Sequence, residues 1–238
     1  MRTAGDNRRW CRWLAVVLSL AVALGAGGLG PLQAATGADP AINLPYEDPE
    51  LDVWVRRFER PGREVYDRRQ EIVGALGLRR GMDVADVGAG TGLFTRLIAP
   101  EVVPGGRVYA VDVSETFVRN VEAAAEARGL DNVVGVVNTQ AGVALPPRSI
   151  DLAFICDTYH HFERPREMMV SIHAALRPGG RVAVIDFRRR EEVASSWVMA
   201  HVRAGKQQVI EEVRAAGFRP AGEEDFLRVN YFLWFEKR

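Results

Sequence analysis

Short apolar runs alternate along the chain with segments in which apolar residues recur every three or four positions. An uninterrupted run of this kind is typical of a strand covered on both faces, whereas the wider spacing is typical of an amphipathic helix. The two patterns alternate from residue 82 onward, which predicts an α/β fold with a largely parallel sheet. The predicted strands are Met82–Val87, Arg107–Asp112, Asn132–Val137, Ile150–Cys156 and Arg181–Phe187, followed by Phe226–Val229 and Tyr231–Phe235, which are joined at Asn230.

Three glycines at alternate positions, Gly88, Gly90 and Gly92, follow the first predicted strand, and a helical pattern follows them. Glycine suits such a turn because it adopts positive φ at little cost and lets a ligand approach the backbone. The first turn of the next helix offers N–H groups to a polar or anionic ligand. Asp112 ends the second strand, about where nucleotide-binding folds place a ribose-binding carboxylate. This combination predicts a nucleotide site.

The segment Asp86–Gly92, with Val111–Ser114 downstream, resembles motif I and the following acidic motif of class I S-adenosylmethionine (SAM) methyltransferases. Leu145–Asp151 and Leu176–Gly180 are similar to signatures of the ubiquinone/menaquinone-methyltransferase-like branch. The resemblance extends from about residue 51 to the C-terminus. It implies a Rossmann-like, doubly wound seven-stranded sheet with a C-terminal antiparallel hairpin, and SAM as the cofactor.

The resemblance also assigns positions to the cofactor. The first acid and the glycine turn would hold the methionyl end, and the acid after the second strand would bind the ribose hydroxyls. Similar methyltransferases place an acid against the adenine amino group after the third strand, where this chain has Gln140 or Asn138; a glutamine can both accept and donate hydrogen bonds there. The implied cofactor-binding residues are Asp86, Gly88, Ala89, Gly90, Gly92, Asp112, Val113, Gln140 and Asp157.

The densest group of reactive side chains follows the fourth strand. Ligands of open parallel sheets bind beyond the carboxyl ends of the strands, so Tyr159, His160 and His161 are candidate catalytic residues that orient or deprotonate the acceptor. We expect one histidine to reach the site and the other to cap or pack the next helix, and the resemblance favours His161 for packing. Neighbouring side chains diverge and no third ligand has matching spacing, so we predict no metal site.

Residues 1–35 have the pattern of an export signal. Four arginines precede an apolar run of about a dozen residues from Trp13, and small residues follow as far as Ala35. The segment is either a cleaved signal peptide or an uncleaved anchor, so the expected location is exported, periplasmic or at the inner membrane, with membrane contact through this segment. A twin-arginine signal at Arg8-Arg9 is a further alternative.

The rest of the chain divides into three predicted parts. Residues 36–50, rich in Pro, Gly, Ala and Asp, are a predicted linker, residues 51–80 a helical lid, and residues 81–238 the methyltransferase domain. Candidate lid residues are Phe58, Arg63, Glu64 and Tyr66, and ordinary packing helices are the alternative. Predicted wall residues of an acceptor pocket are His201, Arg203 and Lys206.

Composition narrows the function further. The formal net charge is +0 and no basic stripe is present, so we expect no nucleic-acid partner. Of the two cysteines, a processed chain keeps one and can form no internal disulfide. The sequence thus predicts a SAM-dependent methyltransferase with a small-molecule acceptor. The alternatives are a non-catalytic exported protein that binds a SAM-like ligand and an NAD-dependent oxidoreductase, which the glycine spacing disfavours.

Overall fold

The computed structural model describes residues 37–238. The predicted signal or anchor at residues 1–35 lies outside this range. Within it, no helix is both long enough and apolar enough to cross a membrane.

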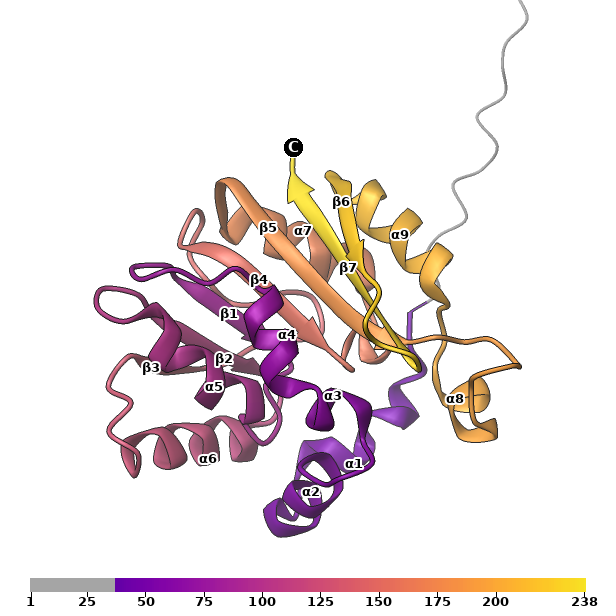
Figure 1. Cartoon of the computed structure of the whole chain (residues 1–238), viewed down its shortest axis with the longest axis horizontal. Helices are drawn as coiled ribbons and strands as arrows, with labels where there is room; N and C mark the ends of the chain where they lie inside the picture. The colour runs from indigo at the N-terminus through magenta and orange to yellow at the C-terminus, as the bar shows by residue number, and fades with distance from the viewer. Residues whose placement is uncertain (1–36) are drawn as a thin grey trace, which may run out of the picture. The chain divides into compact units, whose positions relative to one another are not determined.

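One seven-stranded sheet with the order β3-β2-β1-β4-β5-β7-β6 organises the described chain, as Figure 1 shows. The pairs from β3 to β5 are parallel, and β7 runs antiparallel to both β5 and β6. This confirms the predicted doubly wound sheet with a C-terminal antiparallel hairpin, and it places the switch point between β1 and β4. The strands are β1 Val84–Val87, β2 Val108–Asp112, β3 Val133–Val137, β4 Ile150–Cys156, β5 Leu176–Phe187, β6 Phe218–Glu224 and β7 Asn230–Lys237.

The hairpin strands differ from the prediction. Phe226–Val229 is not a strand: the sixth strand is Phe218–Glu224, and Asn230 begins the seventh strand instead of forming the turn. The sequence pattern of β6 concealed it, because this edge strand is mostly exposed and contains Pro220 and Gly222. Its backbone pairs with β7 all the same, with a register shift between Pro220 and Gly222.

Helices cover both faces of the sheet. One apolar cluster joins β4, β5 and β7 to α7 and α9, and a second joins β1, β4, β5 and β7 to α4 and α5. Ser114 caps α6 as predicted, since its side chain accepts a hydrogen bond from the N–H of Phe117. The helices and 3-10 turns are η1 Pro40–Ile42, α1 Leu44–Glu47, α2 Leu51–Phe58, α3 Glu64–Asp67, α4 Arg69–Ala75, α5 Leu93–Val102, α6 Glu115–Glu126, η2 Tyr159–His161, α7 Pro165–Ala175, α8 Ser196–His201 and α9 Lys206–Ala215.

Four short helices gather at the end of the sheet where the parallel strands finish. Figure 1 shows α1, α2 and α3 beyond this end, with α8 at its other side. Within the predicted helical lid, the segment from Glu64 to Ala75 is divided into α3 and α4 at Arg68. Residues 40–47 of the predicted linker also form η1 and α1.

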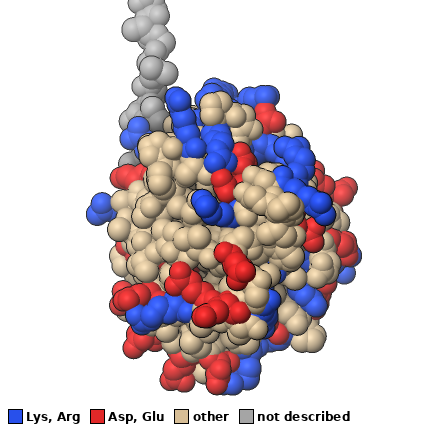
Figure 2. Space-filling model, turned by 90° about the vertical axis from the view of Figure 1, so that its left-hand side faces the viewer, with Lys and Arg blue, Asp and Glu red and all other residues tan. Residues whose placement is uncertain are grey.

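Figure 2 shows the face that lies at the left-hand side of Figure 1. On this face, acidic and basic side chains border a broad area without charges.

Candidate functional site

A cavity of about 660 Å³ opens at the carboxyl ends of β1, β2 and β4. This volume lies in the range of small-molecule and cofactor sites. The glycine turn and Asp112 line one part, and side chains from α1, α2, η2 and α8 line another. The predicted site residues that line the cavity are Asp86, Gly88, Ala89, Gly90, Asp112, Val113, Gln140, Asp157, His160 and His161.

The lack of a side chain has a different consequence at each glycine of the turn. Gly88 has φ +75°, and a Cβ there would lie 2.2 Å from Cγ2 of Thr158, which follows β4. Gly90 has φ +53°, and a Cβ there would lie 3.6 Å from Cε2 of Phe58 in α2. Gly92 lies outside the cavity, which corrects its predicted contact with the cofactor. A Cβ at Gly92 would lie 2.7 Å from Val121, so this glycine lets α5 and α6 pack closely.

Asp112 sits at the cavity wall with its carboxylate fixed by the backbone. Its Oδ2 accepts the N–H of Gly90 at 2.8 Å and its Oδ1 accepts the N–H of Ser114 at 2.9 Å. Burial raises the pKa of this carboxyl, and the backbone donors oppose the rise. Each oxygen has a second lone pair available, so the carboxylate can accept two adjacent hydroxyl groups.

Asp86 is a second buried carboxyl in the same wall. Thr95 donates a 2.6 Å hydrogen bond to its Oδ2. Burial raises the pKa of Asp86 to about 6, because desolvation outweighs the Thr95 hydrogen bonds. Its protonation is therefore sensitive to a cation or donor brought into the cavity.

An unsatisfied acceptor lies beyond the third strand. Asn138 is buried and lines the cavity; its Nδ2 donates to the carbonyls of Thr139 and Gly142. Its Oδ1 is buried without a hydrogen-bond partner in the described chain. Such an atom costs free energy until a donor reaches it, and the adenine amino group is a donor. Gln140 also lines the cavity, so both alternatives considered for the adenine contact remain.

Asp157 holds three segments together at the switch point. It adopts φ +49°, which is uncommon for a residue with a side chain and recurs at functional sites. Its Oδ2 pairs with Arg63 at 2.7 Å and its Oδ1 accepts from Asn230 at 2.6 Å. Burial raises its pKa, and the charge of Arg63 opposes this. Both oxygens thus have partners within the chain, and the predicted cofactor contact of Asp157 stays a prediction.

Tyr159 does not face the cavity, which corrects its predicted catalytic placement. The side chain is fully buried, and its hydroxyl donates a 3.0 Å hydrogen bond to Glu212 of α9. Arg203 holds the same carboxylate through two contacts of 2.9 and 2.8 Å. Burial raises the pKa of the Tyr159 hydroxyl well above its usual value. Arg203 therefore supports α9 in this buried network, and neither it nor Lys206 lines the cavity.

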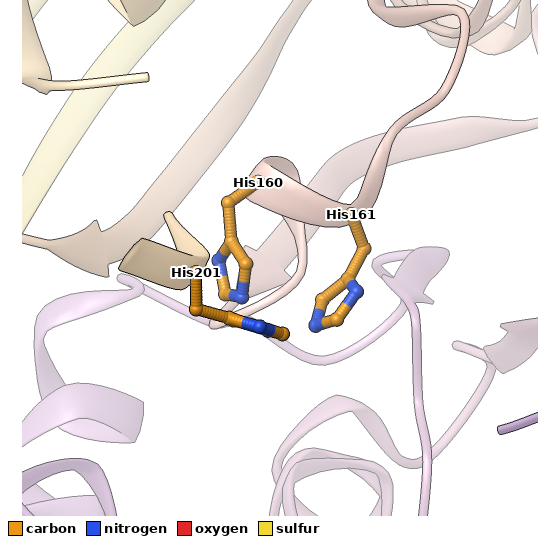
Figure 3. Close-up of side chains that lie close together, drawn as sticks. All are labelled: His160, His161 and His201. Carbon is orange, nitrogen blue, oxygen red and sulfur yellow. The ribbon is translucent and has the colours of Figure 1, made fainter. Parts of the chain in front are cut away.

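Three histidines cluster beside the cavity: His160 and His161 line it, whereas His201, a predicted wall residue, does not. His160 and His161 both line the cavity, and the expected division into one site residue and one packing residue stays a prediction. His201, at the end of α8, brings its ring to theirs, as Figure 3 shows, and the nearest ligand atoms of the three all lie within 4.8 Å of one another. His201 is thus a third imidazole close to the pair in space, although its position in the sequence has no spacing typical of a metal site. Sequence spacing concealed His201 because a long connection containing β5 separates it from η2.

Burial disfavours the charged form of two of the histidines, His161 and His201. Burial lowers the pKa of His161 to about 2, helped by the neighbouring His160 and His201. Burial also lowers the pKa of His201, together with the charges of His160 and Arg57. Trp197 stacks on His201 with ring centres 4.4 Å apart. Neutral imidazoles can accept a proton or bind a metal ion.

The predicted lid residues divide between cavity and support. Phe58, Arg63 and Glu64 line the cavity, whereas Tyr66 does not. The Glu64 carboxylate accepts backbone N–H groups of residues 228–230 and so ties α3 to the start of β7. At the end of α2, Glu59 accepts hydrogen bonds from Thr91 and Arg96, each at 2.8 Å. These polar contacts fasten the helices over the glycine turn.

Comparison with known proteins agrees with this geometry. Residues 85–182 match the family model described as a methyltransferase domain. A demethylmenaquinone methyltransferase from Geobacillus stearothermophilus is 28% identical over 112 residues, which are 47% of this chain and 48% of the relative. The chain thus spans about half the length of the curated relatives it matches first.

Solved structures extend the match over most of the described chain. A SAM-dependent methyltransferase from Aquifex aeolicus superposes with a TM-score of 0.70 at 23% identity, covering 79% of this chain and 99% of that one. Residues 85–182 therefore match a methyltransferase domain, and the described chain has the fold of the SAM-dependent methyltransferases. The [4+2]-cyclase SpnF has the same fold, with a TM-score of 0.64 at 21% identity over 75% of this chain and 84% of its own. The fold therefore does not fix the reaction.

Proposed function

We propose that this protein is a SAM-dependent methyltransferase that acts on a small, largely apolar acceptor. The observation that carries the proposal is the carboxylate of Asp112, buried at the cavity wall and fixed by the N–H groups of Gly90 and Ser114. Its free lone pairs suit the two ribose hydroxyls. The unsatisfied Oδ1 of Asn138 in the same cavity adds an acceptor for the adenine amino group.

The chain supplies position and polarity for this reaction. When bound, SAM supplies an activated methyl group on its sulfonium. Asp86 and the backbone of Gly88 and Gly90 would hold the methionyl end, and Asp112 the ribose. Holding donor and acceptor in line is the main contribution that a protein makes to such a transfer. His160 or His161 would orient the acceptor or remove its proton.

Aromatic side chains contribute to the proposed acceptor part of the cavity. Tyr46, Phe58, Phe187 and Trp197 come from four different segments and line the cavity together with the histidines. Such walls favour a ring-shaped or lipid-like acceptor with one polar group. The Geobacillus relative's name describes a quinone precursor as its substrate, which supports the choice of demethylmenaquinone as a first acceptor to test.

A SAM titration by calorimetry tests the cofactor half of the proposal. We expect the purified chain to bind SAM and Asp112→Ala to bind it at least 100-fold more weakly, because a charged hydrogen-bond pair to a ribose is lost. Asp131→Ala is the matched control, since Asp131 is exposed and does not line the cavity. Equal SAM affinity in Asp112→Ala and the parent chain would refute the ribose contact.

Transfer of a labelled methyl group from SAM to demethylmenaquinone and to a lipid extract tests the reaction half. Methylated product that depends on intact Asp112 supports the proposal. SAM binding without transfer to any acceptor would favour the non-catalytic alternative, or a different reaction on this fold.

We also propose that residues 1–35 export or anchor the domain. The support is the basic start, apolar run and small-residue exit of this segment. Expression of the full chain in a Gram-negative host, followed by fractionation and N-terminal sequencing, tests it. Recovery in the cytoplasm with an intact N-terminus would contradict it.

A further inference from the structure

We infer that His160, His161 and His201 form a binding site for one divalent transition-metal ion of the zinc type. The candidate ligand atoms of the three residues lie within 4.8 Å of one another (Figure 3), and two of the residues, His160 and His161, line the cavity. The spacing of the three histidines in the sequence does not reveal this site. It is an inference from the tertiary structure alone.

Two of the ring nitrogens lack a partner although they are buried. His160 is 2% exposed, and its Nε2 has no hydrogen-bond partner among residues 37–238. The Nε2 of His201 is also buried without a hydrogen-bond partner among the described residues. A buried polar atom without a partner is rare in folded proteins and costs free energy, unless an ion or ligand satisfies it. Two such atoms beside a third imidazole point to a shared cation.

Hydrogen bonds fix the orientation of two rings. Nδ1 of His160 lies 2.8 Å from Oδ1 of Asp186, a carboxylate that can only accept when ionised. The proton of the neutral ring is therefore on Nδ1, and the lone pair is on Nε2. A carboxylate behind the ring is the usual arrangement behind histidines that bind zinc.

Asn43 fixes the ring of His161 in the way that Asp186 fixes the ring of His160. Its Nδ2 donates to the carbonyl of His161 and to Glu163, so its Oδ1 is the atom that faces the ring. The Nδ1 of His161 lies 2.8 Å from this Oδ1 and must donate to it. The lone pair of His161 is consequently also on Nε2. Two neighbouring segments thus hold two adjacent histidines in the tautomer that a metal ion requires.

The donor set selects the class of ion. Three neutral imidazoles suit zinc and its borderline neighbours, and three histidines with one open position are a known arrangement of catalytic zinc. Zinc–nitrogen bonds of about 2.0–2.1 Å bring tetrahedral ligand atoms to roughly 3.3 Å apart, so the rings must close by rotation. At His201 the negative charge of Asp186 opposes the positive charge of Arg57.

The open position would face the acceptor part of the cavity. An acceptor hydroxyl or thiol bound there would lose its proton to water and stay on the metal as an anion, with no change of oxidation state. This consequence rests on the proposed function, whereas metal binding itself does not. It would explain why three histidines, rather than one general base, stand opposite the glycine turn.

Titration of Zn²⁺ into the chelator-treated full chain tests the site without any acceptor. We expect one equivalent to bind, and substitution by Co²⁺ to give the visible absorption of a tetrahedral nitrogen site. His201→Ala should bind Zn²⁺ at least 100-fold more weakly. Asn43→Ala should lose about 10- to 100-fold, because it only positions His161.

His173→Ala is the matched control. It is the only other histidine among the four in the chain, and it packs on Phe218 away from the cavity. We expect it to bind Zn²⁺ as the parent chain does. Thermal unfolding and SAM affinity, measured on each variant, separate loss of the metal site from loss of the fold. Zn²⁺ affinity that is absent in the parent chain, or equal in His201→Ala and His173→Ala, would overturn the inference even if SAM binds.

Discussion

The cofactor side and the acceptor side of one cavity are built in different ways. The cofactor side comes from two consecutive strand–turn–helix units, so Gly88, Gly90 and Asp112 lie within one short stretch of sequence. The proposed acceptor side comes from the α1–α2 segment, η2 and α8, which are far apart along the chain. Asn43 and His161, for example, are 118 positions apart and hydrogen-bonded.

The difference shows which kind of site a sequence pattern can reveal. A ligand held by backbone needs glycines and a strand end at fixed local spacing, and this spacing is visible in the sequence. A pocket held by side chains from several segments has no such spacing. Its partners meet only because short helices fold over the end of the sheet. The variants below test this contrast in order of expected effect.

The largest effect is expected for Gly88→Ala. The new Cβ would lie within 3 Å of three Thr158 side-chain atoms at a positive φ, so the switch point must open. We expect a loss of about 2–4 kcal/mol in free energy of unfolding and at least 100-fold in SAM affinity. Urea unfolding and calorimetry measure the two.

Gly129→Ala is the control for backbone strain. Gly129 has φ +66°, but nothing lies within 4 Å of a Cβ there. It should lose about 1 kcal/mol of stability and no SAM affinity. If both variants bind SAM as the parent does, the glycine turn does not approach the cofactor.

A smaller effect, visible as pH dependence, is expected for Asp86→Asn. The pKa of Asp86 rises from 3.8 to about 6 on folding. The protonated form is therefore favoured in the folded state, and its stabilisation is lost as the pH rises through about 6. The loss amounts to about 3 kcal/mol, at about 1.4 kcal/mol per pKa unit.

Urea unfolding between pH 3.5 and 7 checks this. The parent should lose stability relative to Asp86→Asn as the pH rises, whereas Asp131→Asn should follow the parent. A constant difference between parent and Asp86→Asn across this range would show that Asp86 titrates normally. Bound SAM should reduce the effect if its ammonium group reaches Asp86.

The smallest effect is expected for Tyr159→Phe, on the acceptor side. Loss of the hydrogen bond to Glu212 should cost about 1 kcal/mol of stability and leave SAM affinity within twofold. Tyr231→Phe is the matched comparison: its hydroxyl is buried without a partner in the described part of the chain, so removal should be neutral or stabilising. A large fall in methyl transfer with unchanged stability in Tyr159→Phe would restore its catalytic role.

The local pattern of apolar residues was sufficient to predict most strands of the sheet. Buried parallel strands are continuous apolar runs, and β1, β2, β3 and β4 were predicted to within two residues at each end. The edge strand Phe218–Glu224 was missed because an exposed edge needs no apolar face and tolerates proline. Its position is decided by backbone pairing with β7, a long-range contact that leaves no mark in its own composition.

The sequence by itself determined the cofactor half of this protein: the fold, the glycine turn and Asp112, since each depends on residues close together in the chain. Only the tertiary structure decided the acceptor half. It placed Tyr159 in the packing with α9, brought both His160 and His161 to the cavity, and brought His201 and Asn43 against these two histidines. The physical reason is that side chains after a strand end point where packing directs them, and packing partners come from the whole chain.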